Sequence, residues 1–107
     1  MAAVTEVTSE PVGSLQTVLG ALHDPVRLEM VRRLKAAGTR VRCVDLYDSI
    51  NKSTATHHFK ILREAGIIER AVVDGLIHQR LLDDAVDAVY PGLLTAVVDA
   101  ADRERNG

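Results

Sequence analysis

The sequence is poor in aromatic residues, which limits how its core can be built. It contains no tryptophan, and aromatic residues make up 3% of the chain against 47% for hydrophobic residues as a whole. The core must therefore come from leucine, valine, isoleucine and alanine, which suits helices that pack on helices. A chain of 107 residues is enough for one domain with a modest core.

Cysteine and long apolar runs are also scarce. Cys43 is the one cysteine, so no internal disulfide can form, and a reducing cytoplasm is the expected setting. No apolar run approaches the ~20 residues of a membrane span. The amino terminus lacks a basic region followed by an apolar stretch, so we expect neither a secretory signal nor a membrane partner.

The charge is small overall but unevenly distributed. The formal net charge of −2 by itself argues against a nucleic-acid partner. Residues 27–80, however, carry eleven Lys and Arg against six Asp and Glu, whereas residues 1–26 and 81–107 are acidic. A basic middle between acidic ends can present a local positive face.

The segment 52–66, KSTATHHFKILREAG, is expected to form an amphipathic helix. Ala55, Phe59 and Leu62 recur at helical spacing and predict its buried face. The opposite face carries hydroxyls, an imidazole and an ammonium, from Ser53, Thr56, His57 and Lys60. Such groups can hydrogen-bond base edges and phosphates in a major groove, although they also fit an ordinary solvated face.

Apolar periodicity and helix-capping residues predict the remaining helices. Residues 1–13 are expected to form a flexible leader without a packed element. Asp24 and Pro25 form a helix start, and Gly38 forms a stop. The expected helices cover 14–22, 25–37, 43–49, 83–89 and 92–103. In the third of them we expect the core contacts to be Val44, Tyr47 and Ile50.

The period changes after Gly66. The runs 67–73 and 76–82 are rich in β-formers and are joined by Asp74-Gly75. Asp-Gly between two apolar runs predicts a two-residue hairpin, because both turn positions favour positive φ. The fold class is therefore mainly α with a two-stranded β-hairpin, in the order of a winged helix-turn-helix, as a single domain over 14–105.

Three pieces of the sequence resemble the ArsR/SmtB-type bacterial repressors. They are L-H-D-P-V-R-L at 22–28, K-S-T-A-T-H-H-F-K-I-L-R-E-A-G-I-I at 52–68, and the Asp-Gly hairpin. The resemblance covers about 15–82. It implies a dimer that binds operator double-stranded DNA through helix 52–65 and a wing at 67–82, and that represses until an inducer binds.

The resemblance also implies which side chains meet DNA. Beyond the polar face named above, Lys52 and Thr54 lie at the helix entrance, where amides and side chains reach phosphates. Arg63 reaches a phosphate or pairs with a neighbouring glutamate, either Glu64 or Glu69. The wing contacts are expected to be Arg70 and Arg80, while Asp74 at the wing tip disfavours deep insertion into a minor groove. His58 leans toward the core and is expected to be structural.

Metal, cofactor and enzyme functions are not expected. Family members that sense metals use a Cys-x-Cys in the third helix or Asp, His and Glu on the last helix. Here Cys43 is alone and no histidine follows His78. Cys43 is expected to be a small buried hydrophobe, although a redox or metal role stays open. Thr56 and His57 are adjacent on a helix and point about 100° apart, so they form no catalytic dyad.

The sequence therefore predicts a dimeric, sequence-specific transcriptional repressor, with the first and last helices pairing the subunits. Any inducer is expected to be a small organic molecule between those helices, near Leu19, Tyr90 and Leu94. The alternative is a winged-helix module that binds a protein instead of DNA, which the negative net charge and the acidic wing tip favour. The sequence does not specify the operator, the regulated gene or the inducer.

Overall fold

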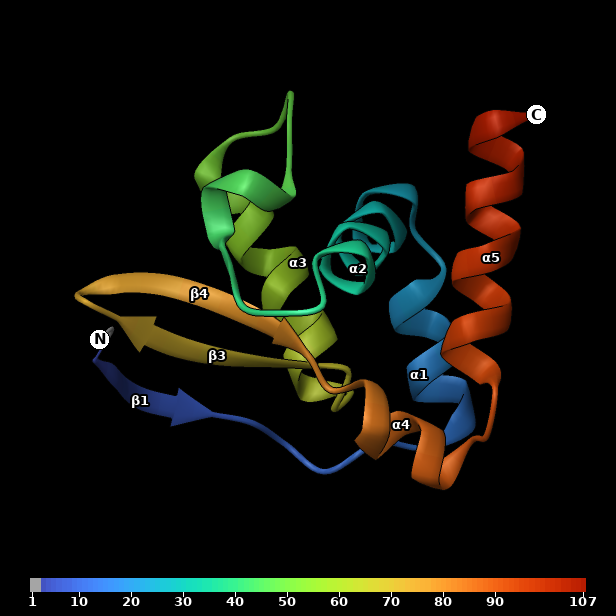
Figure 1. Cartoon of the computed structure of the whole chain (residues 1–107), viewed down its shortest axis with the longest axis horizontal. Coiled ribbons are helices and arrows are strands. Elements are labelled where there is room, and N and C mark those ends of the chain that lie inside the picture. Colours follow the sequence, from blue (N-terminus) through green and yellow to red (C-terminus); the bar gives the residue numbers. More distant parts are fainter. Residues whose placement is uncertain (1–2) are drawn as a thin grey trace.

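A computed structural model describes residues 3–107 as helices packed on one side of an antiparallel sheet (Figure 1). None of the helices in this range is both long enough and apolar enough to cross a membrane. In chain order the elements are β1 (Val4–Thr8), α1 (Leu15–Leu22), α2 (Pro25–Ala37), β2 (Val41–Arg42), the 3₁₀ helix η1 (Cys43–Leu46), α3 (Lys52–Glu64), β3 (Ile68–Val73), β4 (Leu76–Leu81), α4 (Asp83–Val89) and α5 (Leu93–Asn106).

The helix boundaries follow the capping signals of the sequence. The Asp24 carboxylate accepts hydrogen bonds from the backbone N–H of Val26 at 2.8 Å and of Arg27 at 3.1 Å. Burial works to raise the pKa of this carboxyl, but these two donors, together with the nearby charge of Arg27, lower the pKa overall. Gly38 ends α2 in the left-handed conformation, with φ of 66°. Asn51 caps α3 by accepting from Thr54 N–H at 2.8 Å.

The sheet has four strands in the order β1-β3-β4-β2, two more than the two-stranded hairpin that the sequence predicted. The hairpin itself is present, with Asp74 and Gly75 at φ of 50° and 80°. The other two strands add to its edges. β2 has two residues, too few to show a strand period, and all five residues of β1 are exposed, so neither strand has a clear hydrophobic alternation.

The segment before α1, expected to be a leader without a packed element, is tied to the rest of the chain. In β1, Val4 pairs with Val73. Further on, Gly13 N–H donates to Ala65 O at 2.9 Å, and the Tyr90 hydroxyl donates to Gly13 O at 2.9 Å. These partners lie far away along the chain, which is why a local sequence pattern does not reveal them.

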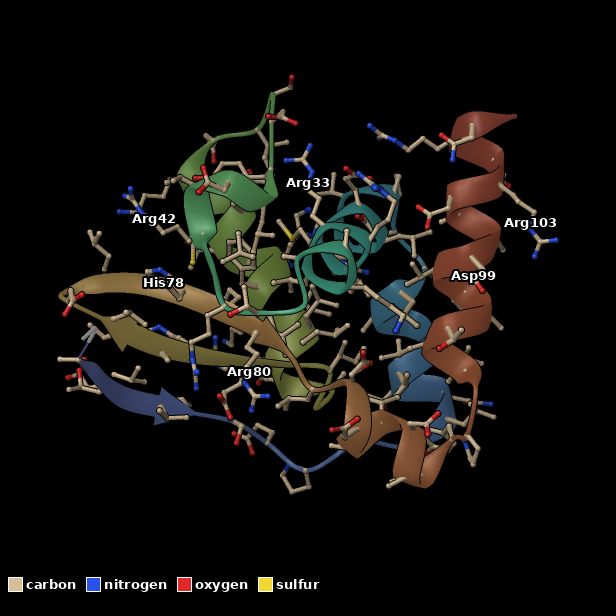
Figure 2. All side chains as sticks on the ribbon, in the orientation of Figure 1. Arg33, Arg42, His78, Arg80, Asp99 and Arg103 are labelled. Atoms are coloured by element: carbon tan, nitrogen blue, oxygen red, sulfur yellow. The ribbon has the colours of Figure 1, made fainter. Side chains whose placement is uncertain are left out.

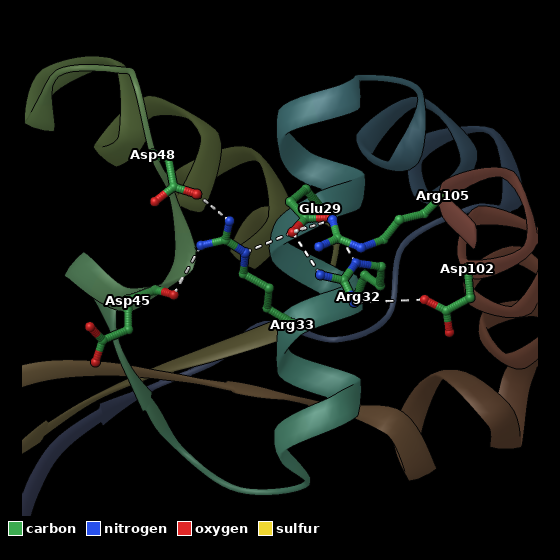
Figure 3. Close-up of polar contacts among 7 residues, drawn as sticks. All are labelled: Glu29, Arg32, Arg33, Asp45, Asp48, Asp102 and Arg105. Carbon is green, nitrogen blue, oxygen red and sulfur yellow. Dashed lines mark hydrogen bonds and ion pairs between the residues drawn. The ribbon is translucent and has the colours of Figure 1, made fainter. Parts of the chain in front are cut away.

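The third predicted helix, 43–49, is shortened to the single turn η1. Leu46 is fully buried, whereas Val44, expected in the core, is 54% exposed. Arg33 of α2 holds this segment in place by donating to Asp45 O at 3.2 Å and to the Asp48 carboxylate (Figure 3). The chain that leads into α3 is therefore anchored by a side chain rather than by a helix of its own.

The core lies around α2, which contacts α1, α3 and α5. Its fully buried side chains include Met30, Val31 and Leu34 from α2 and Leu62 from α3. The few aromatic residues contribute one edge-on pair, Tyr47 with Phe59, whose ring centroids are 6.2 Å apart. The core is thus almost wholly aliphatic, as the composition predicted.

Ion pairs around Glu29 connect α2 to α5. The Glu29 carboxylate accepts from Arg32 Nε at 2.8 Å and from Arg33 Nε at 2.7 Å, and Arg105 of α5 lies 3.8 Å away (Figure 3). Arg32 also lies 3.7 Å from Asp102 of α5. The hydrogen bond from Arg32, followed by that from Arg33, lowers the pKa of Glu29 to about 2 against the opposing effect of burial.

Candidate nucleic-acid interface

Helix α3 divides into a buried face and an exposed polar face. Ala55, Phe59 and Leu62 are buried against the rest of the domain. The predicted contact residues at its start and on its outer face are all exposed: Lys52, Ser53, Thr54, Thr56, His57 and Lys60. The Thr56 hydroxyl donates to Lys52 O at 2.8 Å, so in this rotamer it is left to accept a hydrogen bond from a ligand.

His58 belongs to the packing of the helices and not to the exposed face, as the sequence suggested. It is half-buried, and its Nδ1 lies 3.1 Å from Arg27 Nη1. The same guanidinium donates from Nε to Ala21 O at 2.7 Å, at the end of α1. Arg27 and His58 together therefore join α1, α2 and α3.

The basic residues separate into two groups by their partners. Arg27, Arg32, Arg33, Lys35, Arg40, Arg80 and Arg105 all lie within 4.0 Å of a carboxylate. In the described part of the chain, no ion pair involves Arg42, Lys52, Lys60, Arg63, Arg70 or Arg103. All of the latter except Arg103 line one groove, between α3 and the β3–β4 wing. We call it the α3–wing groove.

Arg63 of α3 and Arg70 of β3, a predicted wing contact, both line the α3–wing groove. Arg63 is half-buried in the groove wall and pairs with neither Glu64 nor Glu69 within residues 3–107. Arg70 of β3 lies opposite Gln79 of β4, so it shares the face of the sheet that packs against the helices. Both cations are therefore available to an anion beside α3.

Arg80 does not join this group, although the sequence placed it among the wing contacts. Side chains alternate along β4, and the buried residues Gln79 and Leu81 flank Arg80, which must point to the other face. There its Nε lies 3.2 Å from Oε1 of Glu69, a carboxylate that Arg40 also contacts at 3.2 Å. Figure 2 shows Arg80 and Arg42 on opposite sides of the hairpin ribbon.

Arg42 was missed at the level of sequence, because residues 39–42 looked like a simple basic connection. Strand β2 places it beside the wing, where Arg42 pairs with His78 of β4. The one signal that could have indicated a role was the charge of the segment T-R-V-R. The position of Arg42 in the α3–wing groove arises only in the folded chain and had no local signal.

Within residues 3–107, the side chains that could bind a metal ion are dispersed. Residues 3–107 contain no group of three or more His, Cys, Asp or Glu side chains able to hold a metal ion. Burial raises the pKa of the Cys43 thiol, which lies 3.4 Å from the Nε2 donor of Gln79. The reactive thiolate form is therefore disfavoured.

Two comparisons with known proteins agree with this geometry. A family model described as a helix-turn-helix domain matches residues 22–71. The chain is also 33% identical over 79 residues to YceK of Bacillus subtilis strain 168, an uncharacterized HTH-type transcriptional regulator. That match covers 72% of this chain and 79% of the relative. The region shared with the family model includes α2, η1 and α3, the elements that present the polar face.

Proposed function

This chain belongs to the HTH-type transcriptional regulators, and within that family we propose that it is a dimeric repressor of the ArsR/SmtB subtype. Its DNA-binding surface is the exposed face of α3 together with the α3–wing groove. The observation that carries this proposal is the segregation of cations that form no ion pair within residues 3–107. Of these, Lys52, Lys60, Arg63 and Arg70 all lie around α3, whereas most other cations are neutralised by carboxylates.

The side chains of this surface have different roles toward DNA. Lys52, Ser53 and Thr54 lie in the first turn of α3, where free backbone N–H groups and the helix dipole favour a phosphate. His57 lies on the exposed face one turn further on and reaches a base edge in the major groove.

The cations of the groove supply the remaining phosphate contacts. Lys60, Arg63 and Arg70 neutralise phosphates, and Arg42 joins them from β2. Arg80, held by Glu69 on the opposite face, is left out of this set. The net charge of the whole chain is therefore a poor guide to its DNA-binding surface.

The wing is too broad to enter a minor groove. Strand β1 lies beside β3, so the wing is three strands wide, and neighbouring strands are about 4.8 Å apart. Three strands span about 10 Å between outer backbones, whereas the minor groove of B-DNA is about 6 Å wide. Asp74 at the tip adds a negative charge. The wing therefore lies along the phosphate backbone.

The first and last helices form the dimer interface in this proposal. On α1, Leu15 and Leu19 are 45% and 43% exposed, so two large apolar side chains on one helix face lie open to solvent. On α5, Leu93 and Val97 are half-buried. Symmetric pairing of two chains would cover this apolar surface. Each subunit of the dimer would then present its α3 to one half of a two-fold symmetric DNA site.

A salt titration of duplex binding tests the proposal directly. The full chain is mixed with a labelled duplex from its own upstream region, and anisotropy is recorded at increasing salt. DNA binding through several phosphates predicts a linear fall of log K with log salt, because counterions are released. Absence of duplex binding at low salt would refute the proposal and favour the module that binds a protein.

A further inference from the structure

The α3–wing groove deepens into a cavity of about 410 Å³ between α3, η1 and the wing. Its walls include Tyr47, Phe59 and Ile77, so its interior is largely apolar. Sites for small molecules are concave, mostly apolar and about 300–1,000 Å³ in volume. The cavity is therefore of a size and character that suits a small organic ligand.

A residue that lines this cavity has a buried polar atom without a hydrogen-bond partner within residues 3–107. Gln79, 2% exposed, lines the cavity, and its Nε2 donates to Cys43 Sγ at 3.4 Å. Its Oε1 is buried and accepts no hydrogen bond within residues 3–107. A buried amide oxygen left without a donor is unfavourable. A ligand with an N–H or O–H group would satisfy it once a small movement of the Gln79 side chain opened this oxygen to the cavity.

The lining of the same cavity also carries positive charge. Arg42, Lys52, Lys60, Arg63 and Arg70 line it, and none of them is in an ion pair in the described part of the chain. A carboxylate at the mouth would meet these cations, while an apolar body occupied the interior. The three features together suit a ligand that has an anionic group, an apolar body and a hydrogen-bond donor.

We propose that this cavity binds a small aromatic carboxylate whose N–H or O–H donor reaches Gln79, and that this ligand releases the protein from DNA. The release rests on the proposed function, whereas the binding does not. The site differs from the position expected between the first and last helices. There the Tyr90 hydroxyl is already bonded to Gly13 O, and Leu94 is 4% exposed.

Release follows from competition for the same cations. Lys52, Lys60, Arg63 and Arg70 are the proposed phosphate contacts and also the rim of the cavity. A bound carboxylate lowers their attraction for DNA. By thermodynamic linkage, bound DNA must lower the affinity of the protein for the ligand by the same factor by which bound ligand lowers its affinity for DNA.

The first experiment measures ligand binding by the full chain without DNA. Titration calorimetry is performed with 4-hydroxyphenylacetate, 4-hydroxybenzoate and indole-3-acetate, which all carry an aromatic ring, a carboxylate and a donor. At least one should bind with a dissociation constant of about 1 mM or tighter. If none of the three binds in this range, the proposal is overturned, whatever the protein does with DNA.

The second experiment tests the hydrogen bond to Gln79 with a matched pair of ligands. Phenylacetate lacks the hydroxyl of 4-hydroxyphenylacetate and should bind wild-type protein about tenfold more weakly. The variant Gln79→Leu should lose this discrimination. Equal binding of the two ligands by the wild-type protein would contradict the proposed contact. This comparison needs no substitution, so it is valid even if the Gln79→Leu variant does not fold.

The third experiment separates the ligand site from the DNA-binding function. Arg70→Ala should weaken the carboxylate ligand several-fold, whereas Arg103→Ala, which removes an unpaired cation of α5 away from the groove, should not (Figure 2). Added to the protein–duplex complex, the ligand should lower the affinity for DNA. The factor should equal the one by which the duplex lowers the affinity for the ligand. A ligand that binds yet leaves duplex affinity unchanged overturns its role as an effector and leaves the DNA-binding proposal standing.

Discussion

At the scale of single residues, the contrast between Lys60 and Arg80 shows how much the neighbours of a cation decide its role. Both are basic, and both were expected at the DNA surface. Lys60 is exposed and unpaired within residues 3–107, while Arg80 is engaged by the buried carboxylate of Glu69. The helical spacing of the apolar residues predicts which face of the helix carries Lys60. No local pattern reveals that Glu69, eleven residues before Arg80, is the partner of Arg80.

Lys60 and His57 should affect DNA binding in different ways. Lys60→Ala removes a phosphate contact, so it should weaken all duplexes alike and lower the salt slope by roughly one per subunit. His57→Ala removes a base contact and should cost about 1–3 kcal/mol at one half-site position. Anisotropy with operator and scrambled duplexes measures both. Wild-type behaviour of both variants would mean that the recognition face is misplaced, and Arg103→Ala is the control for loss of charge.

Gly66 should be the glycine most sensitive to substitution. It has φ of 80°, and a Cβ there would lie 2.4 Å from Pro11 O and 2.5 Å from Val12 Cα, both backbone atoms. Gly66→Ala should therefore lower the free energy of unfolding by about 2–4 kcal/mol. Gly38, at φ of 66° with open space around it, provides the control. Gly38→Ala should cost only about 1 kcal/mol in a urea titration, and equal losses would contradict the steric argument.

At the scale of elements, the sequence predicts what local signals determine. Helix α2 appears with the expected start at Asp24-Pro25 and stop at Gly38, α1 and α3 appear near their expected ranges, and the β3–β4 hairpin turns at Asp74-Gly75. Strands β1 and β2 depend on partners elsewhere in the chain, and η1 is held by Arg33, so local periodicity could not predict them. The face of α3 was predictable from the helical spacing of its apolar residues, while the cavity beside the wing depends on residues distant in the sequence and was not.

The anchoring of α2 by Glu29 should appear in the pH dependence of stability. Its pKa falls from the ordinary value of 4.5 to about 2 in the folded chain. A carboxyl whose pKa is lower in the folded state contributes its full stabilisation of the fold above about pH 4.5. This contribution to the free energy of unfolding is lost as the pH falls toward about 2. Glu29→Gln should therefore be less stable than wild type by about 2 kcal/mol at pH 7 and nearly equal to it at about pH 2.

Urea denaturation across this pH range measures the Glu29 effect. Glu64 offers a matched control, because it is exposed and forms no ion pair within the described residues. Glu64→Gln should leave the pH profile of stability unchanged. A constant difference between wild type and Glu29→Gln at every pH would show that packing, not charge, is responsible.

At the scale of the whole molecule, the dimer is the prediction with the widest consequences. Leu19→Glu places a charge on the exposed apolar side of α1 and should convert a dimer to a monomer at micromolar concentration. Val7→Glu on β1, a valine that is 51% exposed, is the control and should stay dimeric. Light scattering measures both. A wild-type monomer at this concentration would remove the proposed interface.

The pairing of β1 has a consequence for how the chain is made. Ala3 and its partner Asp74 are 71 positions apart, so a ribosome needs roughly 4–14 s to deliver the second after the first. A hairpin forms in about 1–10 μs once its strands are available. For nearly all of that interval, β1 has no strand to join. The wing is therefore completed only late in synthesis, after α1, α2 and α3 have already emerged.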